Sequence, residues 1–177
     1  MFKIVVAVFA VMIALVLAYA ATRPDTLHVE RSVTINAPAE KIFPLINDIH
    51  AWRSWSPWEK LDPAMKRTYS GAAEGPGAVY EWEGNSKAGQ GRMRIAQALA
   101  PSSIRIDLDF VKPIAGHDVA SFKLLPRDGA TEVVWSLDSP SPYMTKLAGL
   151  FLNMDRLIGR DFEAGLANLK AQAERRP

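Results

Sequence analysis

The sequence contains no cysteine and only three histidines. The absence of cysteine excludes disulfide bonds, thiol nucleophiles and every zinc or iron–sulfur site that is built on thiolates. The histidines, His28, His50 and His117, show neither an HExxH pattern nor any paired spacing, so we assign no metal site. The sequence also lacks a GxSxG motif, a P-loop and a dinucleotide-binding fingerprint, and we therefore assign no catalytic residue and no cofactor.

Neither positive nor negative charge predominates in the sequence. The 177 residues include 21 Lys and Arg against 19 Asp and Glu, so bulk electrostatics gives no reason to expect a nucleic-acid partner. Apolar residues make up 49% of the chain, which excludes an intrinsically disordered protein. The composition is that of one ordinary folded domain with an additional apolar segment.

That apolar segment lies near the N-terminus. Ile4 to Ala21 is a run of 18 residues without a charge, an amide or a hydroxyl other than the phenol of Tyr19. As a helix the run would span roughly 27 Å, close to the thickness of the hydrocarbon core of a bilayer. It is apolar on every face, whereas a core helix of a soluble protein needs only one apolar stripe.

Two interpretations of this segment remain open. Residues 1–22 form either a retained single-pass anchor in the cytoplasmic membrane or a signal peptide cleaved after Ala20, because Ala18-Tyr19-Ala20 has the small-x-small pattern of a cleavage site. The run is longer than the usual signal-peptide core of about 7–15 residues, which favours the anchor. Only Lys3 precedes the run, so a cytoplasmic N-terminus is the simplest insertion. Residues 23–26 are then a linker, and residues 27–177 form the domain, which both interpretations place on the extracytoplasmic side of the membrane.

Past the linker, the spacing of apolar residues predicts an antiparallel meander. Alternation up to Ile35 predicts a first strand, and six short runs bounded by Gly, Pro and Asn predict strands at 66–70, 78–84, 92–99, 103–111, 118–125 and 131–137. In the run 103–111 the apolar side chains alternate with Arg105, Asp107 and Asp109. One face of the sheet is therefore expected to be dry.

Helices are predicted on either side of the meander. Pro38 and Glu40 mark the start of a helix, and Pro44 inside it predicts a short or kinked element that ends near Asp48, followed by a second short helix at 50–55. Beyond Pro142, apolar residues recur at steps of three and four from 144 to 169 and predict one long amphipathic helix, in which Gly159 is the position where a break is expected. The fold class is α+β, with a seven-stranded curved antiparallel sheet wrapped around this helix.

Five segments carry a resemblance to a known family: Val29–Phe43, Trp52-x-x-Trp55-Ser56-Pro57-Trp58, Gly77–Gly84, Trp135–Leu137 and Asp161–Lys170. They resemble the SRPBCC superfamily, which has the START-like helix-grip fold, and within it the membrane-anchored branch labelled polyketide cyclase/dehydrase-like. The resemblance covers residues 27–172. It implies a bacterial, periplasmic domain with a cavity between sheet and C-terminal helix that takes small apolar ligands.

The candidate ligand-binding residues are large side chains expected on the dry face or at the mouth of that cavity. They are Trp55, Trp58, Tyr80, Trp82, Met93, Phe110, Phe122, Trp135, Phe151 and Met154. Each of them has an alternative interpretation as a packing residue of the core.

Three functions from different classes follow. The first is a binding or carrier module for a lipid or other hydrophobic small molecule at the membrane surface. The second is a polyketide cyclase or dehydratase in which Tyr80 or Glu81 supplies the acid or base, and this one requires an ionisable side chain that points into the cavity. The third is a non-enzymatic, membrane-tethered adaptor whose protein partner the sequence does not identify. The fold alone does not choose among them.

Overall fold

The sheet contains every strand that the sequence predicts. The computed structural model describes residues 2–175, and within them one antiparallel sheet has the order β1-β7-β6-β5-β4-β3-β2. The strands are β1 (Thr26–Ile35), β2 (Lys66–Gly71), β3 (Ala78–Glu83), β4 (Gln90–Leu99), β5 (Ser103–Lys112), β6 (Gly116–Arg127) and β7 (Ala130–Pro140). Strands β2 to β6 each pair with the next strand along the chain, and β1 pairs with β7 and forms the other edge of the sheet. The predicted meander is confirmed.

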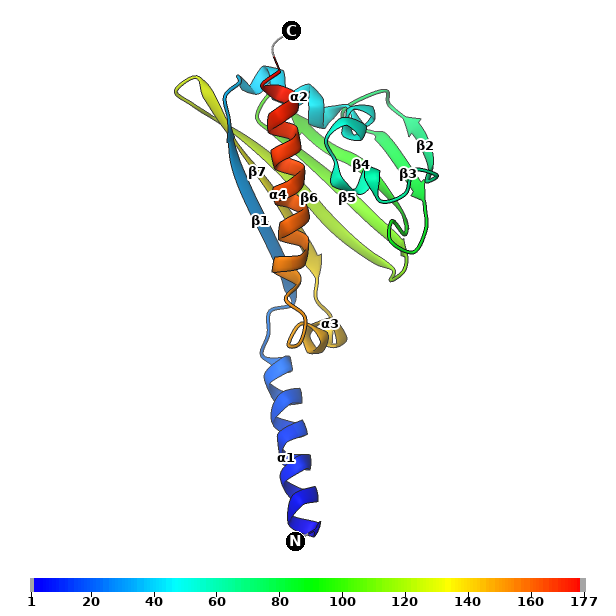
Figure 1. The fold of residues 1–177 in the computed structure, drawn as a ribbon, viewed down its shortest axis with the longest axis vertical. Coiled ribbons are helices and arrows are strands. Elements are labelled where there is room, and N and C mark those ends of the chain that lie inside the picture. Colours follow the sequence, from blue (N-terminus) through cyan, green and yellow to red (C-terminus); the bar gives the residue numbers. More distant parts are fainter. Residues whose placement is uncertain (1, 176–177) are drawn as a thin grey trace.

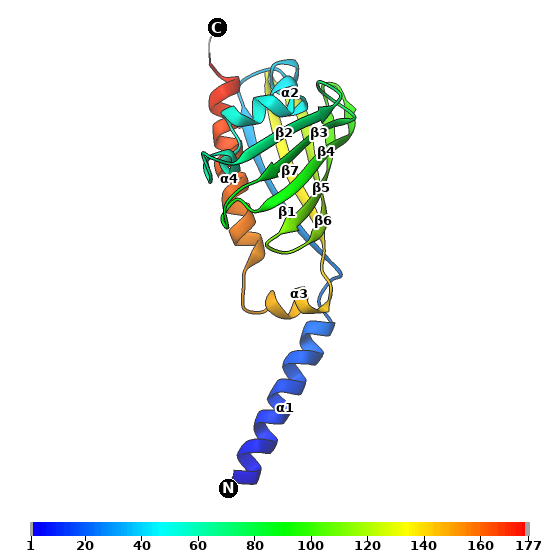
Figure 2. The ribbon, with the colours of Figure 1, turned by 90° about the vertical axis from the view of Figure 1, so that its right-hand side faces the viewer.

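One face of this sheet is buried, as the alternation predicts. On β7 the side chains of Thr131, Val133, Trp135 and Leu137 are all buried. Strand β4 has a register shift between Ile95 and Gln97, and an extra residue of this kind bends a strand and increases its twist. The sheet is therefore curved, with its concave face toward the core (Figure 2).

The short helices between β1 and β2 close one end of the core. Helix α2 (Ala39–Asn47) contains Pro44 and ends at the cap residue Asp48, as predicted, and it buries Ile42 and Ile46. Two 3₁₀ helices follow, η1 (Ile49–Ser54) and η2 (Pro57–Lys60). The second begins with Pro57, whose fixed φ suits the first position of a helical turn. It was not predicted, because four residues are too few to show a periodicity.

The C-terminal segment differs from the prediction of one long helix. It forms two helices, α3 (Tyr143–Ala148) and α4 (Met154–Ala173), and the break lies at 149–153 rather than near Gly159. Asn153 begins the second helix, since its side chain accepts a hydrogen bond from the backbone N–H of Arg156. The apolar spacing continues across the break because both helices present apolar side chains, but α3 contacts the N-terminal helix while α4 contacts β1 and β7.

Helix α4 crosses the concave face of the sheet and completes the fold (Figure 1). It buries Phe162, Leu166 and Leu169 against the sheet. Together with the curved sheet it gives the helix-grip arrangement that the sequence predicts.

Helix α1 (Phe2–Ala21) projects away from the sheet (Figures 1 and 2). Among its residues only Ala20 is buried, so it is not a core helix. It is the one helix in residues 2–175 that is long and apolar enough to cross a membrane. Length and composition of this kind fit either a membrane anchor or a signal sequence.

Candidate functional site

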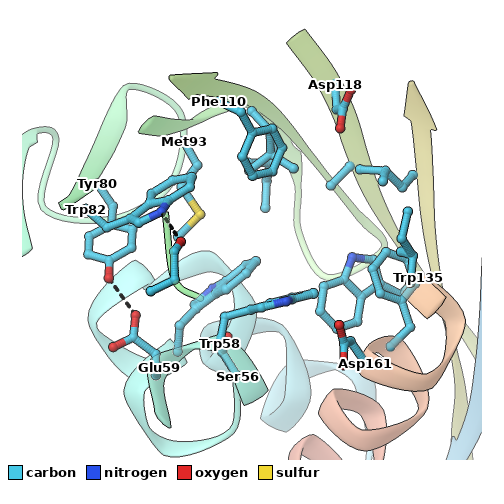
Figure 3. A pocket seen from close by; sticks show the side chains of 18 of the residues that line it. Ser56, Trp58, Glu59, Tyr80, Trp82, Met93, Phe110, Asp118, Trp135 and Asp161 are labelled. Carbon is cyan, nitrogen blue, oxygen red and sulfur yellow. Dashed lines mark hydrogen bonds between the residues drawn. The ribbon is translucent and has the colours of Figure 1, made fainter. Parts of the chain in front are cut away.

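A cavity of about 250 Å³ lies between the concave face of the sheet and α4. Its walls come from η1 and η2, from strands β3 to β7 and from the first half of α4, and most of its lining side chains are apolar or aromatic (Figure 3). Cavities that are mainly apolar with a few polar groups are the usual form of small-molecule sites in proteins.

Three aromatic rings form one wall of the cavity. Trp135 of β7 stacks on Phe162 of α4, with ring centroids 4.1 Å apart and an angle of 6° between the planes. Trp58 of η2 meets the ring of Trp135 edge-on at 5.5 Å. Such pairs add about 0.5–1.5 kcal/mol each beyond the area they bury. This side of the cavity is therefore built of closely packed aromatic rings.

Gly165 makes this aromatic wall sterically possible. A Cβ atom at this position would lie 2.7 Å from Cζ3 of Trp135 and 3.2 Å from Cδ of Pro57. A side chain at residue 165 would thus push both Trp135 and the start of η2 away from α4. The glycine, which is unfavourable inside a helix by about 1 kcal/mol, is explained by this close approach.

The indole nitrogen of Trp135 has no hydrogen-bond acceptor among the described residues. The residue is only 2% exposed, and its Nε1 is buried without a partner. By contrast, Nε1 of Trp52 donates to the Ile46 carbonyl at 2.9 Å and Nε1 of Trp55 to the Leu45 carbonyl at 2.8 Å. A buried unpaired donor costs about 1–3 kcal/mol, and an acceptor atom on a bound ligand would remove that cost.

The opposite wall carries a phenol hydrogen-bonded to a carboxylate. The hydroxyl of Tyr80 donates to Oε1 of Glu59 at 2.6 Å (Figure 3), and Oε2 of Glu59 accepts from Nε of Arg67 at 2.7 Å. The side chains of Glu59 and Arg67 are only 9% and 14% exposed. Burial, followed by the hydrogen bond to Glu59, raises the pKa of Tyr80 above its ordinary value. Tyr80 therefore stays protonated at neutral pH and is a hydrogen-bond donor.

Two further carboxyl groups, Asp118 of β6 and Asp161 of α4, line the cavity. Asp118 is half-buried, and its burial raises its pKa above the ordinary value, while a hydrogen bond with Ser139 acts in the opposite direction. Asp161 is exposed to solvent. The cavity is thus apolar in its interior, with ionisable groups at separate points of its wall.

The structure brings together six of the ten predicted ligand-binding residues. Trp58, Tyr80, Trp82, Met93, Phe110 and Trp135 line the cavity. Alternation along the strands directs the strand residues among them to the concave face of the sheet, and the turn after Trp55 brings Trp58 to the cavity. Their role in binding remains a prediction.

The other four predicted residues are not in the cavity wall. Trp55 and Phe122 are completely buried in the core, where Trp55 is held by its hydrogen bond to Leu45. Phe151 is 78% exposed on the turn between α3 and α4, and Met154 is the first residue of α4. The last two were placed in the wall because a single helix was expected, and the break at 149–153 moves them away.

Several lining residues were not predicted, among them Trp52, Glu59, Asp118, Asp161 and Phe162. Asp118 lies four residues before Phe122 on β6, and residues an even number apart on a strand point to the same face. Alternation alone could therefore have predicted that Asp118 points inward. Glu59 lies in the turn η2, where no periodicity exists. Glu81, which was considered as an acid or base, lies on the outer face, where its carboxylate is 3.8 Å from Nε of Arg92.

Comparison with known proteins agrees with the fold. The sequence model of the family described as polyketide cyclase/dehydrase and lipid transport matches residues 26–174. The Zhui aromatase/cyclase from Streptomyces sp. R1128 superposes with a TM-score of 0.61 at 18% identity, over 85% of this chain and 95% of that one. A protein from Thermobifida fusca gives a TM-score of 0.59 at 23% identity, over 82% and 92% of the two chains.

A third similar structure is the di-domain aromatase/cyclase BexL from the BE-7585A biosynthetic pathway. Its TM-score is 0.62 at 16% identity, over 90% of this chain and 54% of BexL. No curated protein sequence gave a significant match. At identities this low, the solved structures establish the fold and not the ligand.

Proposed function

Because the chain belongs to the polyketide cyclase/dehydrase and lipid transport family, we propose that it binds and carries a small hydrophobic molecule at the membrane surface. The observation that supports this most directly is the cavity of about 250 Å³ with its stacked wall of Trp135 and Phe162. This volume lies just below the range of about 300–1,000 Å³ that is typical of small-molecule pockets. The size favours a ligand of one or two rings, or one short acyl chain, over a complete two-chain phospholipid.

The polar groups of the wall suggest what else the ligand carries. The unpaired Nε1 of Trp135 favours an oxygen acceptor, such as a carbonyl or hydroxyl, on a ligand that is otherwise apolar. Glu59 accepts one bond from Tyr80 and one from Arg67 on its two oxygens, and a carboxylate has further lone pairs for a ligand hydroxyl. We therefore expect an oxygenated aromatic or acyl compound rather than a pure hydrocarbon.

We further propose that residues 1–22 anchor the protein, that 23–26 link it and that 27–177 form a domain on the periplasmic side of the cytoplasmic membrane. The exposed apolar helix α1 supports an anchor, and its length exceeds that of a usual signal-peptide core. Release into the periplasm by cleavage after Ala20 is the alternative. The mass of the mature protein distinguishes the two.

The experiment that tests binding is native mass spectrometry of the full chain, purified from its own host in a mild detergent, followed by extraction of any bound compound. We expect a stoichiometric small-molecule adduct. Leu108 lines the cavity, so the larger side chain of Leu108→Trp should occupy the ligand's space and abolish the adduct. The control Leu125→Trp, at an exposed position on β6, should retain it. The proposal is wrong if no adduct forms and a lipid extract also fails to bind, and a protein adaptor then becomes the better hypothesis.

One observation favours an enzyme of the cyclase or dehydratase class as a second candidate. Tyr80 and Glu59 are ionisable, inward-pointing and joined by a hydrogen bond of 2.6 Å, which meets the requirement stated above for acid or base chemistry. The variant Tyr80→Phe separates the two functions. In a carrier, the bound compound is unchanged in both the native protein and the variant. In an enzyme, the native protein converts the compound, whereas the variant binds it but leaves it unconverted. Mass analysis of the bound compound before and after incubation reads this difference.

A further inference from the structure

We propose that residues 143–152, which comprise α3 and the turn after it, form a membrane-docking surface. In this inference, which rests on the proposed anchoring by α1, the segment lies in the interfacial layer of the same bilayer. It would hold the domain so that the end of the cavity nearest α1 faces the lipid. We call residues 143–152 the docking segment.

The docking segment exposes large apolar side chains that nothing in the described residues covers. Met144 is 70% exposed, Phe151 is 78% exposed, and Leu152 is also exposed, although all three lie within nine residues of one another. Helix α3 has no buried residue at all. Three large apolar side chains exposed within one segment of ten residues are candidates for an interaction surface.

The segment is fixed against the membrane helix rather than against the sheet. The hydroxyl of Tyr143 donates to the backbone carbonyl of Leu17 in α1 at 3.0 Å. Leu17 lies four residues before the end of α1, which at 1.5 Å per residue corresponds to about 6 Å below the end of the helix. Interfacial helices bury their apolar faces about 5–10 Å into the boundary between headgroups and acyl chains. Contact with Leu17 thus sets α3 at that depth.

Polar contacts at this level fit the headgroup region. Nζ of Lys146 is 2.6 Å from Oδ1 of Asp25, a residue of the linker that follows α1. Arg23 lies 6.0 Å above the ring of Tyr19. Tyrosine and cationic side chains gather at membrane interfaces, where an aromatic body is in lipid and a polar group is in water. The apolar residues of the docking segment are then the ones directed to the acyl chains.

The cavity lies in the half of the domain that is nearer the docking segment. Strand pairing places Thr26, which follows α1, beside Pro140, just before α3. The lining residues Leu137, Asp118 and Phe110 all come from this end of β7, β6 and β5. Figure 2 shows α3 between this end of the sheet and α1. A ligand leaving the bilayer beside α3 would thus meet the end of the sheet from which these lining residues come.

The test uses the absence of native cysteine. Single cysteines introduced by Phe151→Cys, Leu99→Cys and Val11→Cys are labelled with an environment-sensitive fluorophore, and the full chain is placed in nanodiscs of phosphatidylethanolamine and phosphatidylglycerol. Leu99 is a matched control, since it is 68% exposed but lies at the far end of β4. Val11 lies in the middle of α1. Quenching is then measured with doxyl-labelled lipids and with aqueous iodide.

We expect lipid-borne doxyl groups to quench the labels at residues 11 and 151, and iodide to quench the label at residue 99 at least fivefold more strongly than the label at 151. If residue 11 is quenched by doxyl while residue 151 responds like residue 99, docking is wrong and the anchor stands. If residue 11 is accessible to iodide, the anchor itself is wrong, and the docking inference falls with it. The two failures are therefore distinguishable.

Discussion

The guanidinium of Arg31 occupies the space that a side chain on Gly159 would need. A Cβ atom at residue 159 would lie 2.0 Å from Nη2 of Arg31. From this position Nε of Arg31 donates to Glu163 at 2.9 Å and Nη2 donates to Asp155 at 3.0 Å. Both carboxylates belong to α4, and Arg31 belongs to β1. Gly159 thus allows an arginine on the edge strand to hold the helix that closes the cavity.

This relationship predicts that the residue at position 31 decides whether Gly159→Ala lowers or raises the free energy of unfolding. In the native protein we expect the variant to lower the free energy of unfolding, because the added Cβ atom displaces Arg31 from Asp155 and Glu163. In an Arg31→Ala background we expect Gly159→Ala to raise it by about 1 kcal/mol, the usual helix-propensity gain over glycine. Urea unfolding of the four proteins measures the cycle.

The control for this cycle is Gly116→Ala, since a Cβ atom at residue 116 has nothing within 4 Å. It should change stability little in either background. An equal effect of Gly159→Ala in both backgrounds would show that Arg31 does not explain the glycine.

A second prediction compares two stacked tyrosines on paired strands. Tyr69 and Tyr80 face each other with ring centroids 5.1 Å apart, but only Tyr80 has a partner for its hydroxyl, while the hydroxyl of Tyr69 is buried without one. Tyr80→Phe should lower the free energy of unfolding by about 1.5–3 kcal/mol, the range for a hydrogen bond to a charged group. Tyr69→Phe should be neutral or stabilising. Equal losses in denaturant unfolding would contradict the assigned hydrogen bonds.

A third prediction concerns two histidines at the end of the sheet near α1. His28 lies 2.7 Å from Asp138 and His117 lies 2.6 Å from Asp109, in each case through Nδ1. The hydrogen bond to the aspartate is the main cause that raises the pKa of each histidine above the ordinary value of 6.5. The stabilisation that each histidine contributes is fully present below pH 6.5, the pKa in the unfolded chain. It is lost as the pH rises through the higher pKa of the folded state.

Titration of the imidazole proton resonances by nuclear magnetic resonance checks this. Asp138→Asn should return the pKa of His28 toward 6.5 and leave His117 unchanged, and Asp109→Asn should do the reverse, so that each variant is the control for the other. The gain in stability on acidification should be small, because all four side chains are about half exposed and such pairs are screened by solvent. A His28 titration unaffected by Asp138→Asn would show that the pair does not form in solution.

The sequence was sufficient for the strands because alternation is a direct consequence of burying one face of a sheet. It predicted β5 and β7 and the inward position of Phe110 and Trp135, since parity fixes which face a side chain joins. Periodicity records that a side chain is apolar but not which surface it meets. For this reason sequence reasoning places Phe151 in the cavity wall, whereas in the structure it is 78% exposed on the turn between α3 and α4.

The polar part of the site was beyond sequence reasoning for a different reason. Glu59 is brought to Tyr80 by a turn of four residues, and the two are 21 positions apart. Neither residue type nor spacing distinguishes Glu59 from a surface acid such as Glu81, which was the residue considered. The partner that makes Glu59 stable in a buried position, Arg67, lies on the edge strand β2 and becomes visible only once the sheet is folded.

The last prediction uses the unpaired indole nitrogen to test the chemistry of the ligand. Trp135→Phe removes the N–H group and keeps an aromatic ring in contact with Phe162. The smaller ring lowers the free energy of unfolding, but the loss should be smaller than for a tryptophan whose indole N–H is hydrogen-bonded, because an unpaired buried donor is removed with it. Affinity for an oxygenated ligand should fall by about 3- to 10-fold, since one hydrogen bond contributes about 0.5–1.5 kcal/mol, while affinity for a hydrocarbon of similar shape should not fall. The matched control is Trp55→Phe, because Trp55 is equally buried but donates to Leu45. That variant should lose stability and show no such selectivity among ligands. Competition titrations with pairs of compounds that differ by one carbonyl measure the ratio, and equal losses for both members of a pair would mean that Nε1 of Trp135 does not contact the ligand.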